Sequence, residues 1–230
     1  MPFNFKLLYL LGITSQFLLA QKLPENFVLV KDFVPSIAIE MRYSTNNNFT
    51  GRPIPGYGSR EAVITIATAS ALKKVQKELN KLGLGLKIFD AYRPQKAVNY
   101  FIKWSDQPND TIMKRKYYPN LKKKKLFDLG YIASKSGHTR GSTVDLTLLY
   151  VSGPDKGKEV DMGSVWDLFG VHSGYGDMAI SIIQKANRKL LRDLKAAHKF
   201  LPYDKEWWHF SLNNEPYPDT YFDFIVPNQT

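Results

Sequence analysis

The chain has 230 residues, of which 43% are hydrophobic and 13% aromatic, and its formal net charge is +11. This length and composition are sufficient for one well-filled hydrophobic core, so a single folded domain is expected. Cysteine is absent, which excludes a disulfide framework and a thiolate metal site and leaves His, Asp and Glu as the side chains that can hold a metal.

The first twenty residues are predicted to be a secretory signal peptide. Lys6 precedes an apolar run over residues 7–13, and Ala20 supplies a small residue for cleavage before Gln21. A membrane anchor is the alternative, but polar residues 14–16 keep the run below the roughly 18 to 20 apolar residues that a membrane span needs. We therefore expect a mature domain over residues 21–230, secreted across the inner membrane to the periplasm and not inserted in the membrane after cleavage.

The first part of this domain contains both strand and helix patterns. Apolar residues predict two short strands over residues 27–30 and 37–43, and a long loop rich in Asn, Gly and Pro follows over residues 46–58. Helical periodicity then predicts an amphipathic helix over residues 59–82, with Gly83 as its stop signal.

A buried strand is predicted over residues 84–89, and Pro94 is suited to the first position of a helix that continues to residue 104. Arg93 therefore lies where a strand gives way to a helix, which is a usual place for a functional side chain to project beside a site. The alternative interpretation of Arg93 is a salt bridge to Asp90.

Residues 105–135 are polar, lysine-rich and poorly periodic, so they are predicted to form a lid or insertion with one short helix. Basic residues gather at positions 114–116 and 122–125. Such a run is usually a solvated loop, and weak contact with an anionic cell-wall polymer or membrane surface is the functional alternative. No nucleic-acid partner is expected, because charge alone supports one and no recognition motif accompanies it.

The last part of the chain is predicted to contain a strand over residues 143–151, a helix over residues 177–200 and a strand over residues 207–212. The predicted apolar face of that helix includes Ile183. Helices and strands do not alternate regularly, so the predicted fold class is α+β, with a central antiparallel or mixed sheet flanked by helices.

Two motifs indicate a metal site. His138 and Asp145 lie seven positions apart around a glycine, and zinc readily accepts imidazole nitrogen and carboxylate oxygen. A catalytic zinc site needs a third protein ligand, for which His209 is the best candidate. Glu206 lies close enough in sequence to act as a base on bound water.

The spacing of these residues sets a geometric condition. A regular strand sends residues an odd number apart to opposite faces, so His138 and Asp145 cannot both bind one ion from an uninterrupted strand. We therefore expect the residues between them to turn. Glu206 and His209, three apart, meet the same condition unless Glu206 lies on the loop that leads into the strand.

Taken together, five motifs resemble the zinc-dependent D-alanyl-D-alanine dipeptidases of the VanX type: residues 42–51, 90–94, 136–147, 161–163 and 206–209. The resemblance covers the chain from about residue 25 to residue 215. It implies one Zn²⁺ per chain at one edge of the sheet, bound by His138, Asp145 and His209. It further implies that Glu206 is the catalytic base and that Arg93 stabilises the transition state.

The resemblance also implies a small D,D-dipeptide as substrate. Asp161 is then the candidate for the substrate ammonium, although it is nearly as well suited to capping the turn at residues 162–163. Tyr43 and Ser136 are further candidates for the pocket lining. The alternatives are a D,D- or L,D-carboxypeptidase that acts on cell-wall peptides and a non-catalytic wall-binding zinc module.

Overall fold

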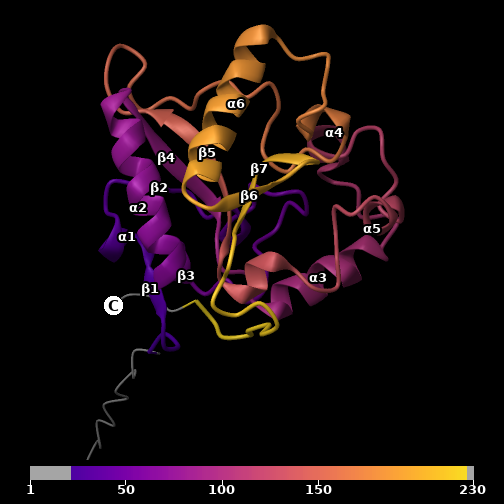
Figure 1. Cartoon of the computed structure of the whole chain (residues 1–230). Coiled ribbons are helices and arrows are strands. Elements are labelled where there is room, and N and C mark those ends of the chain that lie inside the picture. The colour runs from indigo at the N-terminus through magenta and orange to yellow at the C-terminus, as the bar shows by residue number, and fades with distance from the viewer. Residues whose placement is uncertain (1–21, 227–230) are drawn as a thin grey trace, which may run out of the picture.

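A computed structural model describes residues 22–226, so the predicted signal peptide at residues 1–20 lies outside the described residues. The fold is α+β, as predicted, and its centre is a five-stranded mixed sheet (Figure 1). In order, its strands are β2 (Ala38–Ile39), β4 (Leu84–Asp90), β5 (Thr143–Tyr150), β7 (Glu206–Leu212) and β6 (Phe200–Tyr203). The β2–β4 pairing is parallel, and the other three pairings are antiparallel.

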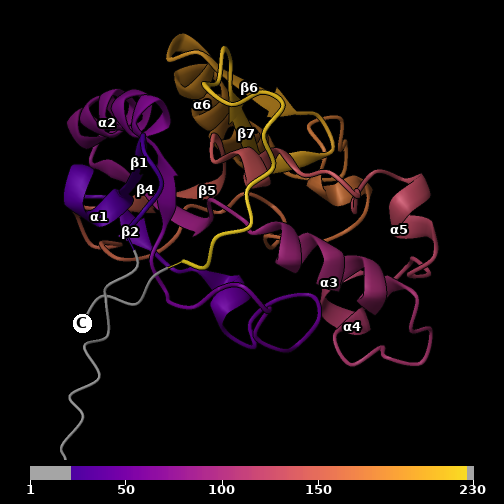
Figure 2. The ribbon, with the colours of Figure 1, turned by 90° about the horizontal axis from the view of Figure 1, so that it is seen from below.

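Two further strands, β1 (Phe27–Leu29) and β3 (Val63–Thr65), form a separate antiparallel pair. Figure 2 shows α2 (Ile66–Lys81) and α6 (Ile182–Ala197) on one side of the main sheet and the region from α3 to α5, residues 95–128, on the other. The α-helices are α1 (Val30–Phe33), α2 (Ile66–Lys81), α3 (Gln95–Ser105), α4 (Lys114–Tyr117), α5 (Lys125–Asp128) and α6 (Ile182–Ala197). The 3₁₀ helices are η1 (Arg42–Ser44), η2 (Gly137–Arg140) and η3 (Val171–Ser173).

Helix α2 has the predicted buried face but begins later than predicted. Leu72, Val75 and Leu79 are fully buried, as their helical spacing indicates. The preceding residues 63–65 form β3 instead of the first turn, because they pair with β1 and because the Thr65 side chain caps the helix by accepting the Thr68 N–H.

Helix α6 also begins later, at a capping box made by Ser181 and Gln184. Its predicted apolar face is partly wrong, since Ile183 is 72% exposed while Arg188 is buried. The Arg188 guanidinium donates hydrogen bonds to the carbonyl oxygens of Met162, Gly174 and His172, so its polar groups are satisfied inside the protein. Residue 200, predicted to be helical, begins β6.

Two other predictions need correction. The predicted strand over residues 37–43 is reduced to Ala38–Ile39, followed by η1. The segment 105–135 contains two short helices, α4 and α5, instead of one. Within residues 22–226, no helix is both long and apolar enough to cross a membrane.

Candidate metal centre

Two aspartates and one histidine lie side by side in a row on the three inner strands of the main sheet. Asp145 on β5 is paired with Asp90 on β4 and with His209 on β7 in the antiparallel registers. Directly paired residues on neighbouring strands place their side chains on the same face of a sheet. The sequence placed the site at one edge of the sheet, whereas these strands are its second, third and fourth.

His138 reaches this row from a tight turn. The Ser136 hydroxyl accepts the His138 N–H at 3.3 Å, η2 follows, and Gly141 ends it in the left-handed region at φ 80°. A Cβ atom at position 141 would also collide with the Phe27 ring, so glycine is needed there for two reasons. The predicted turn between His138 and Asp145 is therefore confirmed.

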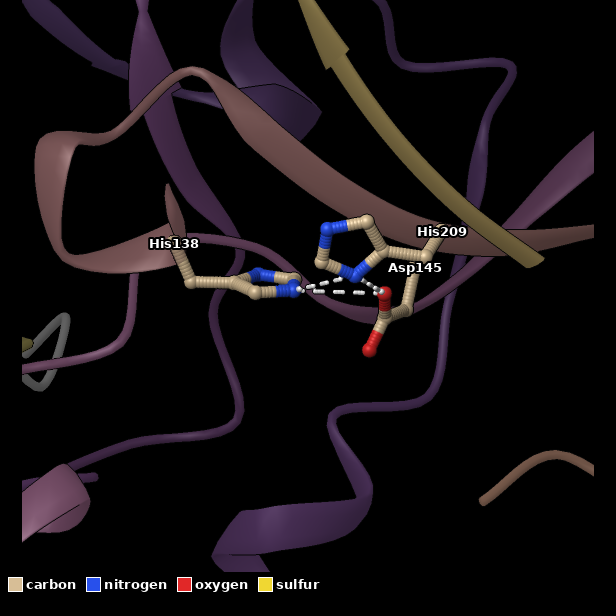
Figure 3. A group of neighbouring side chains, drawn as sticks. All are labelled: His138, Asp145 and His209. Carbon is tan, nitrogen blue, oxygen red and sulfur yellow. Dashed lines mark hydrogen bonds and ion pairs between the residues drawn. The ribbon is translucent and has the colours of Figure 1, made fainter. Parts of the chain in front are cut away.

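The three predicted metal ligands converge on one point (Figure 3). The His138 Nε2 atom lies 3.2 Å from Asp145 Oδ1 and 3.3 Å from His209 Nδ1, and the last two atoms are 3.1 Å apart. Ligand atoms about 2.0 to 2.1 Å from a tetrahedral zinc ion are separated by roughly 3.3 Å. The donor set and its spacing thus fit zinc, with one coordination position left for a non-protein ligand.

Hydrogen bonding orients the donor atoms for this role. The His138 Nδ1 atom lies 2.8 Å from the Ala91 carbonyl oxygen, so this nitrogen donates its proton and the lone pair of Nε2 faces the site. Asp145 Oδ1 is buried and accepts no hydrogen bond from any residue in the range 22–226. A buried carboxylate oxygen without a donor is satisfied when it binds a cation.

The charge states of the ligands also favour metal binding. Burial lowers the pKa of His209 from its ordinary value despite the nearby Asp145, so the imidazole is kept neutral. Burial would raise the pKa of the Asp145 carboxyl, but His138 and His209 outweigh this effect and hold that pKa below its ordinary value. Both residues are therefore in the protonation states that bind metal.

Glu206 is the first residue of β7, directly after the turn at residues 204–205, and it lines the same cavity as His209. Glu206 therefore lies inside β7 and not on the loop before it, and the β6–β7 register shifts between the Pro202–Phe210 and Tyr203–Glu206 pairs, which interrupts the regular alternation between Glu206 and His209. The Glu206 Oε2 atom lies 3.5 Å from His209 Nδ1. Burial, followed by the charges of Asp145 and Asp167, raises the pKa of the Glu206 carboxyl well above its ordinary value. A cation held by the neighbouring ligands would counter that negative charge.

Arg93 both forms a salt bridge with Asp90 and projects beside the candidate site, the two interpretations that the sequence left open. Its guanidinium donates to Asp90 Oδ2 from Nε at 3.0 Å and from Nη2 at 2.8 Å, which confirms the salt bridge. The same Nη2 atom lies 3.9 Å from Asp145 Oδ2, and the side chain lines the cavity. Asp90 therefore holds a fixed guanidinium beside the candidate metal ligands.

These residues enclose a cavity of about 260 Å³, which Tyr43 and Ser136 also line. The cavity is further bordered by residues 130–133 at the end of the predicted lid. Asp161 lies elsewhere, in a separate hollow, where its carboxylate accepts the Gly163 N–H at 2.9 Å and a hydrogen bond from Gln184. The structure thus shows the turn-capping role of Asp161 and does not bring it to the metal ligands.

The carboxylate that does reach the cavity from this loop is Asp167, which the sequence interpretation missed. Asp167 is buried at φ 63°, and Tyr43 donates its hydroxyl proton to Asp167 Oδ2 at 2.7 Å. Burial and the charge of Asp145 raise the pKa of Asp167 well above its ordinary value. A positive φ at a residue other than glycine is the structural signal of its special position, and the sequence does not display this signal.

The chain is similar to known proteins along most of its length. The model of the peptidase family M15, described as D-ala-D-ala dipeptidase, matches residues 24–227. This chain belongs to the D-ala-D-ala dipeptidase family. Its members are zinc metallopeptidases, so the predicted family and enzyme class are confirmed, and the family points to zinc as the metal at the three ligands.

Two relatives named D-alanyl-D-alanine dipeptidase align along most of the chain. The protein from Streptomyces coelicolor is 43% identical, with 87% of this chain and 98% of the relative covered. The protein from Enterococcus faecalis is 41% identical, with the same shares covered. A crystal structure of a zinc-bound mutant of the vancomycin resistance D,D-pentapeptidase VanY has a TM-score of 0.40 and 12% identity, over 76% of this chain and 82% of that chain.

Proposed function

We propose that this peptidase hydrolyses D-alanyl-D-alanine to two molecules of D-alanine. The observation that carries the proposal is the convergence of His138, Asp145 and His209 beside Glu206 in one small cavity. The relatives named D-alanyl-D-alanine dipeptidase support this substrate, because this chain covers 98% of the length of two of them.

Each side chain has a distinct part in such a hydrolysis. A zinc ion at the three ligands would lower the pKa of water toward neutrality and polarise the substrate carbonyl. Glu206 takes the proton of the attacking water and delivers it to the departing amine. Its place suits both steps, since Glu206 lines the cavity and its Oε2 atom lies 3.5 Å from the ligand atom His209 Nδ1.

Arg93 acts on the negative charge that develops on the former carbonyl oxygen. Its guanidinium is always protonated and is held in place by Asp90, so donors are positioned before the charge develops. Removal of one such donor commonly lowers kcat by about 10²- to 10³-fold.

Substrate selection depends on the charged ends of the dipeptide, because one methyl group per residue contributes little apolar binding. Asp167 is buried and faces the cavity together with Tyr43, and it is suited to receive the substrate ammonium, whose positive charge would favour the ionised carboxylate. The role first predicted for Asp161 thus passes to a carboxylate six residues later. Ser136, at the cavity wall, remains a candidate for contact with the substrate.

The substrate is tested by incubating the purified zinc-loaded protein with D-Ala-D-Ala and, separately, with a muramyl pentapeptide that ends in D-Ala-D-Ala. We expect release of D-alanine from the dipeptide only, and loss of that release when a chelator is added. Release from the pentapeptide would instead indicate a D,D-carboxypeptidase. Release from neither substrate would favour a non-catalytic wall-binding module.

We further propose that the protein is exported to the periplasm, on the basis of the leader-like pattern at residues 1–20. The expected result is a mature protein that begins near Gln21 in the periplasmic fraction. N-terminal sequencing after cell fractionation measures this. A soluble cytoplasmic protein that retains Met1 would contradict export.

The basic segment 114–125 supports a proposal of weak contact with anionic cell-wall polymers. Lys122 and Lys124 are exposed, whereas the buried Lys123 ammonium donates to the backbone carbonyl oxygens of Gln107 and Asp110. Exposed charges act through salt-sensitive attraction, so co-sedimentation with purified cell walls should weaken at high salt. The double change Lys122→Glu and Lys124→Glu should weaken it at low salt as well, and unchanged co-sedimentation would contradict the proposal.

A further inference from the structure

The chain continues past β7 as an irregular C-terminal segment, defined here as residues 213–226. It runs from the end of β7 past the start of α3 (Figure 2). Tyr217, Phe222 and Phe224 of this segment belong to a second hydrophobic cluster with β1 and Tyr92, separate from the main core. Tyr92 immediately precedes Arg93, so this cluster adjoins the catalytic region.

The C-terminal segment is hydrogen-bonded to the turn that carries His138. The Phe222 N–H donates to the Thr139 carbonyl oxygen at 3.1 Å. Glu215 accepts from Arg140 Nη2 at 2.7 Å and from Arg140 Nε at 2.9 Å. Thr139 and Arg140 directly follow the metal ligand, and both therefore contact the C-terminal segment.

The same segment is also hydrogen-bonded to the start of α3, next to the turn that carries Arg93. The Phe222 carbonyl oxygen accepts the Gln95 N–H at 3.0 Å, and Asp223 Oδ1 accepts the Lys96 N–H at 2.7 Å. These are the first N–H groups of α3, whose own N-cap residue, Pro94, provides no side-chain acceptor. Asp223 therefore caps α3 from a distant part of the sequence, at the helix end where a carboxylate is most stabilising.

Tyr92 adds a third connection. Its hydroxyl donates to the Phe224 carbonyl oxygen at 3.0 Å, and its ring is stacked on the Phe224 ring with centroids 3.9 Å apart. Phe222 thus connects the two turns through its backbone. Its N–H is hydrogen-bonded to the turn that carries His138, and its C=O to the turn that carries Arg93. The two turns are also hydrogen-bonded to each other. The Arg93 N–H donates to the His138 carbonyl oxygen at 3.3 Å, and His138 Nδ1 donates to the Ala91 carbonyl oxygen.

We propose that the C-terminal segment is a positioning element that fixes Arg93 relative to His138, and that Asp223 is its principal positioning residue. Asp223 does not line the cavity, so it acts through the two turns and not on the substrate. The kinetic consequence rests on the proposed dipeptidase function. The expected effect on zinc affinity does not rest on the dipeptidase function, because it depends only on the placement of His138.

The size of the effect follows from how strongly catalysis and metal binding depend on geometry. A displacement of about 1 Å in a catalytic group can lower the rate by about 10²-fold. Loss of a residue that orients a metal ligand commonly weakens metal affinity by about 10- to 100-fold. We expect Asp223→Ala to lower kcat by about tenfold or more, with a smaller change in KM, because Arg93 acts on the transition state.

The test compares three variants of the full-length protein. Asp223→Ala removes the acceptor for the Lys96 N–H, and Asp223→Asn keeps an acceptor oxygen at the same place. Asp219→Ala is the matched control, since Asp219 is an exposed carboxylate of the same segment. For each variant kcat and KM are measured per zinc-loaded folded molecule, and zinc affinity is measured by competition with a chelator.

We expect Asp223→Ala to lower both kcat and zinc affinity, Asp223→Asn to restore most of each, and Asp219→Ala to leave both unchanged. Equal values for Asp223→Ala and Asp219→Ala would overturn the proposal, as would a loss that follows only the fraction of unfolded protein. If the wild type releases no D-alanine, the dipeptidase function fails, while the zinc affinities still decide this proposal.

A milder variant keeps the proposal testable if Asp223→Ala does not fold. Tyr92→Phe removes the hydrogen bond to the Phe224 carbonyl oxygen and keeps the stacked ring. A decrease of a few-fold in kcat, with unchanged thermal unfolding, would support the positioning role. Wild-type kcat and zinc affinity in Tyr92→Phe would overturn it in that case.

Discussion

Replacement of Glu206 with Gln should lower kcat for D-Ala-D-Ala by about 10²- to 10⁴-fold, which is the usual contribution of a general acid–base group. The amide of Gln has nearly the size and shape of the carboxyl, so the cavity should keep its form. It cannot take a proton from water or return one to the leaving amine. Because Glu206 does not belong to the three-donor cluster, zinc should remain bound at one ion per chain.

The measurement combines steady-state kinetics with metal analysis of the same preparation. Glu78→Gln is a suitable control, because Glu78 lies on α2, pairs with His198 and does not line the cavity. Wild-type turnover by Glu206→Gln would remove Glu206 from the mechanism. Loss of zinc from this variant would show instead that Glu206 contributes to holding the metal.

Replacement of His138 with Ala should abolish both zinc binding and turnover. It removes one of three ligands and also leaves the Ala91 carbonyl oxygen without the proton that His138 Nδ1 donates. A lost orienting group alone weakens metal affinity by about 10- to 100-fold, so the loss of a ligand itself should exceed this range. Turnover should then fall to the level of the chelated wild type.

Zinc content and chelator competition measure the first effect, and release of D-alanine measures the second. His172→Ala is the matched control, since His172 is an exposed histidine that pairs with Asp177 outside the cavity. Full zinc content together with wild-type turnover in His138→Ala would exclude this centre as the catalytic site.

The sequence predicted which three side chains converge, His138, Asp145 and His209, because part of the constraint on them is local and chemical. A glycine between His138 and Asp145 indicates a turn, and the structure contains that turn at Gly141. The absence of cysteine limited the ligands to His, Asp and Glu. The pairing of Asp145 with His209 across neighbouring strands required the fold, since sequence spacing does not reveal which strands pair.

Errors arose where distant contacts override local pattern. The Val63–Thr65 segment reads as part of a helix, but pairing with β1 makes it a strand. Arg188 can be buried because the backbone carbonyl oxygens of Met162, His172 and Gly174 accept its hydrogen bonds. Asp161 and Asp167 lie in the same loop, and only the fold shows that Asp167 reaches the cavity while Asp161 caps a turn.

The row formed by Asp90, Asp145 and His209 is built on paired interior strands of the sheet, which are joined by backbone hydrogen bonds that use none of the metal-ligating atoms. Domains in which metal binding drives folding lose their structure when the metal is withdrawn. Here the scaffold and the ion are separable, so the chelated protein should keep its secondary structure and recover its activity when zinc is restored, without passing through the denatured state.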